Sequence, residues 1–221
     1  MVTPYYQDDL ITLYLADCLP MMREMSDKAF DLAIVDPQFG IGISRSARLV
    51  TDKGLQAKAW DDVPISPDYF KDLFRVSINQ IIWGGNYYAL PPARNYVAWD
   101  KLQPEGLSFG MFDLAWTSFD TSNKMFRRSS SRDSRIHPTQ KPAALYRWLL
   151  KNYAKPGDTI LDTHAGSCSL AIACHDLGFT LTAFEIDEEY LSAAVDRIKR
   201  YLRQPKMFKP VIVQPEQESF L

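Results

Sequence analysis

Asp36 and Pro37 follow an apolar run at 31–35 and open the string Asp-Pro-Gln-Phe-Gly. A carboxylate oxygen and a backbone carbonyl oxygen are both acceptors, so this loop can take the two hydrogens of a planar amine. Holding both hydrogens localises a nitrogen lone pair that is otherwise delocalised into a nucleobase ring. Phe39 offers a surface on which a base flipped out of a duplex can stack. These residues indicate chemistry on an exocyclic amine that needs neither a nucleophile nor a metal, although a plain turn is the simpler interpretation.

A second polar loop, at 162–169, leaves an apolar strand and enters a helix. In an open parallel sheet, ligands bind beyond the carboxyl ends of the strands. Gly166 permits close backbone approach, and Glu185, one strand later, can accept from both ribose hydroxyls. Ile186 can cover one face of an adenine ring. Asp162 would repel a diphosphate but suits the ammonium of a methionine moiety. The loop therefore favours S-adenosylmethionine over NAD or ATP, the alternative being an ordinary tight turn.

A third polar loop, His-Pro-Thr-Gln-Lys-Pro at 137–142, precedes a predicted helix. Three such loops can converge on one ligand only if the two halves of the sheet lie side by side. We therefore expect the carboxylates of Asp36 and Asp162 to open into a common cavity from neighbouring strands.

Strands and helices alternate along the chain, which predicts a mostly parallel α/β sheet. Two of the strands alternate in polarity and are expected to pair antiparallel, at 95–100 and 113–119. The other strands are expected at 11–15, 31–35, 79–83, 159–162 and 181–185. Helices are expected at 18–25, 67–77, 142–153, 168–177 and 188–202, with Ser66 and Asp187 as caps of the second and the last.

The 221 residues are about one domain long, and a 46% hydrophobic content is enough for a core, which argues against disorder. We expect a single domain over 1–203 and a tail at 204–221. The chain shows no leader and no apolar run near 18 residues, which favours a cytoplasmic protein without a membrane span. Three cysteines without CxxC spacing argue against disulfides, and no ligand spacing recurs that would indicate zinc.

Several aromatic and histidine residues have simpler roles. Trp83, Trp99 and Trp116 are expected in the core. His137 is expected to orient its loop, and His175 to lie on a helix surface.

The net charge is −2, yet positive charge gathers in two segments of little periodicity, 41–60 and 120–136. Such segments suit contact with a polyanion, although solvated surface loops have the same composition. We interpret them as small inserted recognition segments. The residues expected to contact DNA are Arg45, Arg48, Lys53, Lys58, Arg127, Arg128 and Arg132.

Together these loops resemble the amino-group DNA methyltransferases of the permuted, beta-type order, in which the catalytic loop precedes the cofactor loop. The Asp36 loop is similar to their Asp-Pro-Pro-Tyr motif, and 137–142 to the stretch that opens their cofactor domain. The loop at 162–167 is similar to their cofactor loop, and Glu185 to their ribose-binding acid. The resemblance covers about residues 8–202 and is strongest for small, phage-like or orphan members.

The resemblance implies a circularly permuted, Rossmann-like methyltransferase fold, with a mostly parallel seven-stranded sheet and an antiparallel edge. It implies S-adenosylmethionine as cofactor, double-stranded DNA as substrate, and adenine as target, because the catalytic loop begins with aspartate. A homodimer is expected by analogy only. The implied catalytic residues are Asp36, Pro37 and Phe39. The implied cofactor residues are Asp17, Cys18, Thr139, Gln140, Lys141, Asp162, His164, Gly166, Ser167, Glu185 and Ile186.

Two positions depart from the family pattern. Gln38 replaces the second proline of the catalytic motif, which loosens the loop, and Cys168 stands where glycine is usual. These departures motivate an alternative, a catalytically silent homologue that binds cofactor or DNA. Methylation of cytosine N4, or of RNA, is a further alternative.

Overall fold

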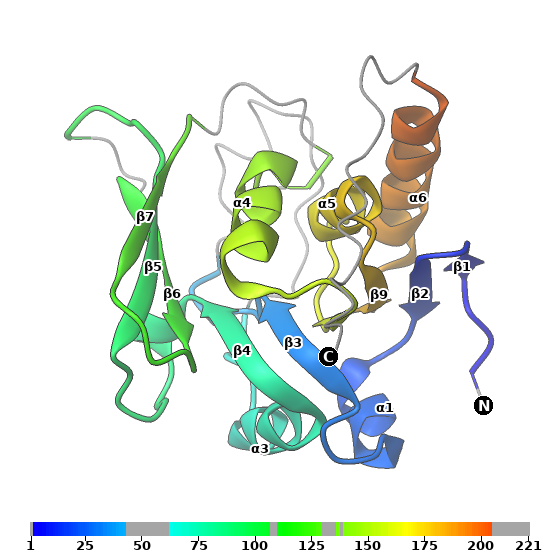
Figure 1. Ribbon diagram of the computed structural model, residues 1–221, viewed down its shortest axis with the longest axis horizontal. Coiled ribbons are helices and arrows are strands. Elements are labelled where there is room, and N and C mark those ends of the chain that lie inside the picture. Colours follow the sequence, from blue (N-terminus) through cyan, green and yellow to red (C-terminus); the bar gives the residue numbers. More distant parts are fainter. Residues whose placement is uncertain (1, 43–61, 107–109, 130–135, 138, 205–221) are drawn as a thin grey trace, which may run out of the picture.

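The computed structural model describes residues 2–42, 62–106, 110–129, 136–137 and 139–204. One mixed sheet runs through these ranges, in the strand order β1-β2-β9-β8-β3-β4-β6-β5-β7 (Figure 1). The strands are β1 (Tyr6–Gln7), β2 (Ile11–Leu15), β3 (Phe30–Val35), β4 (Ser77–Trp83), β5 (Asn95–Asp100), β6 (Phe112–Thr117), β7 (Lys124–Arg127), β8 (Thr159–Asp162) and β9 (Thr180–Glu185).

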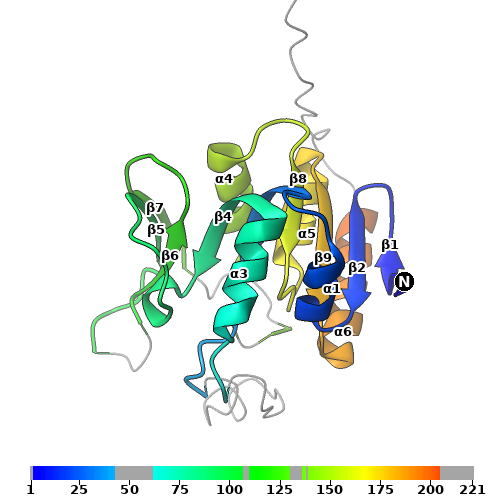
Figure 2. The same ribbon diagram turned by 90° about the horizontal axis from the view of Figure 1, so that it is seen from below.

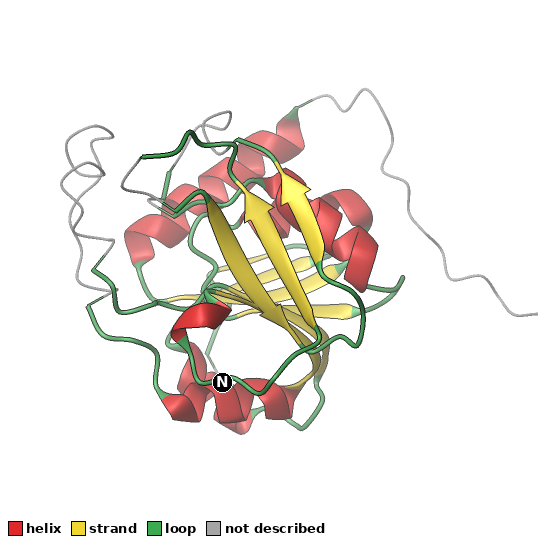
Figure 3. Cartoon of the chain, turned by 90° about the vertical axis from the view of Figure 1, so that its left-hand side faces the viewer, coloured by secondary structure: helices red, strands yellow, loops and turns green. Residues whose placement is uncertain are grey.

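Helices cover both faces of this sheet and make three layers (Figures 2 and 3). One face carries α4 (Ala143–Tyr153), α5 (Ser169–Leu177) and α6 (Glu188–Arg203). The other face carries α1 (Cys18–Glu24) and α3 (Pro67–Val76). None of the helices in the described ranges combines the length and the apolar character needed to cross a bilayer.

The alternation of side chains along β3 shows how the two cores form. Leu32 and Ile34 belong to the core beneath α4, α5 and α6. Ala33 and Val35 belong to the core beneath α1 and α3. Because successive strand residues point to opposite faces, a strand buried on both sides needs a continuous apolar run. This run places the following residue, Asp36, at the side of the sheet where the parallel strands have their carboxyl ends.

The parallel pairing of β3 with β8 joins the two halves of the chain. Leu32 lies opposite Ile160, and Ala33 opposite Leu161. The early strand β2 pairs in parallel with β9, from Ile11 opposite Leu181. Strand β3 thus precedes β8 in sequence and lies beside it in space, which confirms the permuted Rossmann-like fold.

All seven predicted strands are present, and β5 pairs antiparallel with β6 as expected. The described residues add two short strands at the sheet edges, β1 and β7. Strand β7 corrects one expectation, since residues 124–127 belong to a segment predicted to be irregular. The three tryptophans Trp83, Trp99 and Trp116 are buried, as predicted.

The helix caps agree with the sequence in part. The side chain of Asp187 accepts from the amide of Tyr190 at the start of α6 (3.1 Å), as predicted. Ser66 occupies the N-cap position of α3, but its side chain makes no capping bond. Helix α5 begins at Ser169, one residue later than predicted, because Cys168 adopts a left-handed conformation with φ 52°.

Candidate active site at the carboxyl edge of the sheet

Three carboxylates lie at one edge of the sheet because their strands are parallel neighbours. Asp36 directly follows β3, Asp162 ends β8, and Glu185 ends β9. The strand pairing β3-β8-β9 places them in that order along the edge. The charges of Asp36 and Glu185 both act on Asp162, which raises its pKa after the larger effect of burial. The loops that begin at Asp36 and Asp162 therefore leave neighbouring strands, as expected.

The two oxygens of the Asp36 carboxylate have different surroundings. Oδ2 accepts from the ammonium of Lys141. Oδ1 is buried and has no hydrogen-bond partner among the described residues. Burial raises the pKa of Asp36, while the Lys141 charge and its hydrogen bond act in the opposite direction. A buried acceptor is costly to leave without a partner, so Oδ1 is able to accept from a donor such as an N–H group.

The carbonyls of the catalytic loop are held by a tyrosine that the sequence did not single out. The hydroxyl of Tyr88 lies 2.9 Å from the carbonyl oxygen of Pro37 and 3.2 Å from that of Gln38. The amide of Ile65 donates to the same Gln38 oxygen (3.4 Å). These contacts fix the shape of the loop where the second proline of the motif is missing.

Phe39 packs between a glycine and a tyrosine. Its ring stacks on that of Tyr87, with centroids 4.8 Å apart and planes 13° apart. On Gly84, which has φ +71°, a Cβ atom would lie 2.2 Å from the Phe39 ring. Only glycine satisfies both the left-handed backbone and this close approach. The left-handed turn at Gly84, directly after β4, therefore leaves room for the Phe39 ring.

The cofactor loop is tied to the next strand through Glu185. The amide of Gly166 donates to Oε2 of Glu185 (2.8 Å), and the amide of Asp187 donates to Oε1 (2.9 Å). Burial raises the pKa of Glu185, and these amide bonds lower it. A carboxylate has about four acceptor sites, so both oxygens keep capacity for ribose hydroxyls. Ile186, next to it, is apolar and 68% exposed.

Asp162 is nearly enclosed at the centre of this edge. Its Oδ1 accepts from the amide of His164 (3.1 Å). Burial raises the pKa of Asp162 to about 7. A cationic ligand would favour the ionised carboxylate, so the residue suits the ammonium of S-adenosylmethionine. The donors and acceptors at Asp162, Gly166 and Glu185 fit that cofactor.

His164 and Thr163 form a small buried network with a helix residue. The hydroxyl of Thr163 lies 2.9 Å from Nδ1 of His164 and 2.6 Å from the hydroxyl of Tyr69 in α3. Burial lowers the pKa of His164 to about 4, so its ring is neutral at pH 7. No pattern in the sequence indicates this bond between Tyr69 and the loop at 162–169.

The segment that precedes α4 bridges the cofactor and catalytic loops. The ring of His137 lies 3.6 Å from where a Cβ of Gly166 would stand, and it packs on Tyr190. Thr139 contacts Nδ1 of His137 through its hydroxyl (3.2 Å), and the side chain of Gln140 accepts from the amide of Ile136 (3.0 Å). Lys141, predicted to bind cofactor, contacts the Asp36 carboxylate.

The remaining predicted cofactor residues make short-range contacts or are buried. Asp17 caps α1 by accepting from the amide of Leu19 (2.9 Å), and Cys18 after it is buried. The hydroxyl of Ser167 lies 3.1 Å from that of Ser169. Cys168 is buried in the larger core, so its side chain packs beneath the start of α5.

Of the residues predicted to contact DNA, only two are described. Arg45, Arg48, Lys53, Lys58 and Arg132 lie outside the described residues. The Arg127 side chain is 69% exposed and pairs with Asp100 (3.4 Å). Arg128 is half-buried, and its carbonyl accepts from the indole of Trp99 (2.9 Å). Because β5 and β7 run parallel to β4, both arginines lie at the edge of the sheet that carries Asp36.

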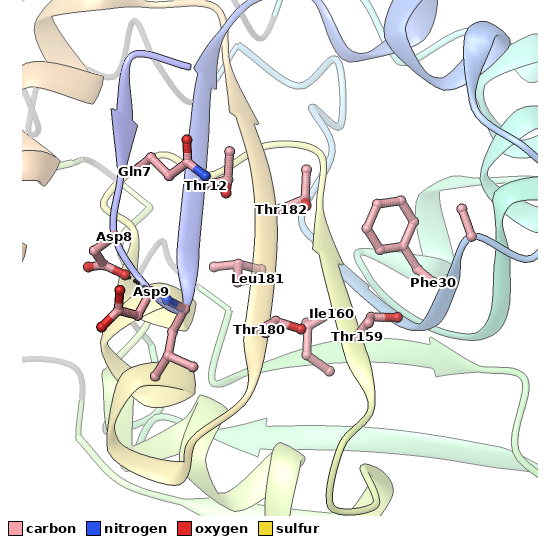
Figure 4. Close-up of a pocket in the computed structure, with 12 residues that line it drawn as sticks. Gln7, Asp8, Asp9, Thr12, Phe30, Thr159, Ile160, Thr180, Leu181 and Thr182 are labelled. Carbon is pink, nitrogen blue, oxygen red and sulfur yellow. Dashed lines mark hydrogen bonds between the residues drawn. The ribbon is translucent and has the colours of Figure 1, made fainter. Parts of the chain in front are cut away.

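A pocket of about 190 Å³ lies at the opposite edge, where β8 and β9 begin at Thr159 and Thr180 (Figure 4). Its carboxylate Asp8 accepts from the amide of Ile11 (2.8 Å) and the hydroxyl of Tyr6 (2.7 Å). These bonds stabilise the turn between β1 and β2. The polar groups of Asp8 in the pocket therefore have a structural role, and we assign no ligand to the pocket. Among the described residues, no group of three or more His, Cys, Asp and Glu side chains is arranged to hold a metal ion.

Comparison with known proteins identifies similar chains. A family model described as DNA methylase, covering N6 and N4 enzymes, matches residues 32–196. The type II methyltransferase M2.DpnII of Streptococcus pneumoniae is 23% identical over 254 residues, covering 90% of this chain and 93% of that protein. The structure of PvuII DNA methyltransferase (cytosine-N4-specific) superposes with a TM-score of 0.62 at 14% identity, over 90% of this chain and 94% of that one. The M1.HpyAVI–SAM complex superposes with a TM-score of 0.59 at 18% identity, over 85% and 100%.

Proposed function

The chain belongs to the N6/N4 DNA methylase family, and from that premise we propose that it transfers a methyl group from S-adenosylmethionine to the N6 amine of adenine in double-stranded DNA. The observation that carries the proposal is the buried Oδ1 of Asp36, which has no hydrogen-bond partner among the described residues and lies at the end of the sheet where the cofactor loop begins. An exocyclic amine supplies the donor that this oxygen lacks.

The catalytic loop orients the amine by its hydrogens. Oδ1 of Asp36 accepts one N–H, and the carbonyl oxygen of Pro37 accepts the other with the lone pair that Tyr88 leaves free. With both hydrogens held, the nitrogen lone pair points out of the base plane. Methylation leaves an extra proton on the amine, and Oδ1 of Asp36 is placed to receive it. Fixed acceptors of this kind lower the barrier because they need no reorganisation during the reaction.

The cofactor loop holds the donor next to this amine. S-Adenosylmethionine, when bound, supplies a methyl group already activated on a sulfonium. Asp162 binds the ammonium of its methionine moiety, and Glu185 accepts from the ribose hydroxyls. Ile186 covers the adenine ring, and His164, neutral at pH 7, lines the same loop. The other residues predicted to bind cofactor, apart from Lys141, are part of the same proposal.

Adenine is proposed as the target because the catalytic motif begins with aspartate. Methylation of cytosine N4 is the second candidate, since a cytosine-N4-specific enzyme shares the fold. Both bases present an amine with two hydrogens, so the acceptors at Asp36 and Pro37 serve either. The base must be identified chemically.

We propose that DNA approaches over the sheet edge that carries both Asp36 and Arg127. The exposed guanidinium of Arg127 suits a phosphate contact, which positions the duplex without reading its sequence. Arg128 is less suited to that role because its carbonyl anchors Trp99 and its side chain is half-buried.

Tritiated cofactor and unmethylated genomic DNA test the proposal directly. We expect label in DNA, recovered as N6-methyladenine after nucleoside digestion, and recovery as N4-methylcytosine would select the second candidate. Asp36→Ala is expected to abolish transfer while calorimetry shows nearly unchanged cofactor binding. Asp68→Ala is a matched control because that carboxylate is 73% exposed on α3. If wild-type protein binds cofactor but labels no DNA over varied sequence contexts, the chain is a silent homologue.

A further inference from the structure

Lys141 is buried between the catalytic carboxylate and an indole. Only 3% of its side chain is exposed. Its ammonium contacts Oδ2 of Asp36 and lies 5.1 Å from the centre of the Trp83 ring. Trp83 is itself fully buried at the end of β4, the strand next to β3. Burying an ammonium costs free energy unless a carboxylate or an aromatic face compensates the lost hydration.

The pairing explains why the two oxygens of Asp36 differ. A carboxylate can rotate and exchange its oxygens when nothing holds it. Here the ammonium holds Oδ2, and the other oxygen, Oδ1, is buried without a hydrogen-bond partner among the described residues. The contact with Lys141 therefore restrains the rotation of the Asp36 carboxylate. It fixes which oxygen is able to accept from the amine and how that oxygen is oriented.

Among the charges around Asp36, that of Lys141 counteracts most strongly the rise in the Asp36 pKa that burial causes. Lys101 also favours the ionised carboxylate, whereas Asp113 disfavours it. Asp162 repels Asp36 from the neighbouring strand, and Tyr146 of α4 lies within its electrostatic reach. Lys101 is already paired with Asp113 at 2.7 Å.

This position is distinct from the cofactor role that the sequence suggested for Lys141. The Lys141 ammonium is engaged on the other side of the site, where it contacts Oδ2 of Asp36. Its neighbours in the same segment turn elsewhere, with Gln140 bonded to Ile136 and His137 against the cofactor loop.

We propose that Lys141 is the positioning residue of the catalytic carboxylate: it fixes Oδ2 of Asp36, keeps the group ionised, and leaves Oδ1 as the carboxylate oxygen that accepts from the target amine. The inference rests on the proposed methyl transfer. It adds a function to the segment before α4, which couples the cofactor side of the site to the catalytic loop.

The first test separates catalysis from cofactor binding. In Lys141→Met, kcat at pH 7 is expected to fall about 100-fold, and the acid limb of the pH–rate profile to move up by about one pH unit or more, because Asp36 then protonates more readily. The dissociation constant for S-adenosylmethionine is expected to stay within about threefold. Lys141→Arg should recover part of kcat and return the acid limb toward that of the wild type. Weaker cofactor binding with an unchanged pH profile would overturn the proposal.

The second test does not depend on activity. Lys141→Met, Asp36→Asn and the double variant form a cycle measured by urea unfolding. Lys141→Met is expected to lower the unfolding midpoint in the wild-type background and much less in the Asp36→Asn background. Arg147→Met, which breaks the Arg147–Asp176 pair at 2.6 Å, should lower the midpoint equally in both backgrounds. Additive effects of Lys141→Met and Asp36→Asn would refute the coupling.

The two tests also distinguish the possible failures. If the wild-type protein methylates nothing, the proposed function fails, yet the unfolding cycle still confirms or refutes the contact between Lys141 and Asp36. If the wild type is active and the cycle shows no coupling, the positioning role alone is wrong.

Discussion

The ring of Phe39 lies parallel to that of Tyr87, with 4.8 Å between the centroids, and Tyr87 is 49% exposed. Phe39 is the ring proposed to stack on the target base, so Tyr87 occupies a face that the base could use. Tyr87→Ala frees this face, and an aromatic pair contributes about 0.5–1.5 kcal/mol. We expect KM for DNA to fall about twofold to tenfold with an unchanged cofactor dissociation constant. Steady-state kinetics and calorimetry measure both, and a higher KM would show instead that Tyr87 supports the base.

Tyr88→Phe tests whether the tyrosine hydroxyl substitutes for the missing proline. Losing its bonds to the Pro37 and Gln38 carbonyls removes about 0.5–1.5 kcal/mol and loosens the loop. We expect kcat to fall about tenfold with cofactor binding unchanged. Gln38→Pro alone should change kcat less than about threefold, because the loop is already held, but should recover activity when combined with Tyr88→Phe. A large gain from Gln38→Pro in the wild-type background would contradict this account.

Glu185→Gln tests the link between the cofactor loop and β9. The amide side chain has one oxygen, whereas Glu185 accepts from two backbone amides, at Gly166 and Asp187. One buried N–H is left unpaired, so we expect the free energy of unfolding to fall by about 1–3 kcal/mol and cofactor affinity to fall at least about tenfold. Ile186→Ala, at the exposed neighbouring residue, should lower the affinity for the cofactor while changing the free energy of unfolding by less than about 0.5 kcal/mol. Urea unfolding and calorimetry on both variants decide the point.

Asp162→Asn tests the burial of the carboxyl at the centre of the site. The folded-state pKa of about 7 lies above the ordinary value of 3.8, so folding favours the protonated form. Wild-type stability from this group is present below about pH 4 and is lost as pH rises through 7. Without cofactor, the variant should therefore gain stability over the wild type between pH 4 and pH 8, by about 2–4 kcal/mol at the upper end. His164, whose lowered pKa acts oppositely in this window, is common to both proteins. A pH-independent difference in urea unfolding would contradict the expectation.

The sheet was predictable where burial leaves a plain pattern. Strand β3 is an apolar run because helices cover both its faces, and β8 follows the same rule. Strand β7 was missed because Met125 and Phe126 stand among basic residues, and only pairing with β5 makes it a strand. Strand β1 has two residues and is defined by its pairing with β2 alone.

Motifs could predict the site, but not the contacts between the motifs. Spacing and residue type indicated Asp36, Asp162 and Glu185, whose strands the fold brings together. The pairing of Lys141 with Asp36 joins positions 105 residues apart, and no local pattern reports it. The hydroxyl of Tyr88 likewise has a function only once the Pro37 carbonyl lies within its reach.

The parallel pairing of Ile11 with Leu181 has a consequence for how the protein is made. During translation, β2 leaves the ribosome long before its partner β9 has been synthesised. Until then the apolar strand β2 lacks this partner. Closing so long a loop is entropically slow, and folding dominated by distant contacts is slow and prone to aggregation. Methyl transfer should therefore begin only after translation has passed residue 185, and yield in cells should depend on chaperones that shield the nascent chain.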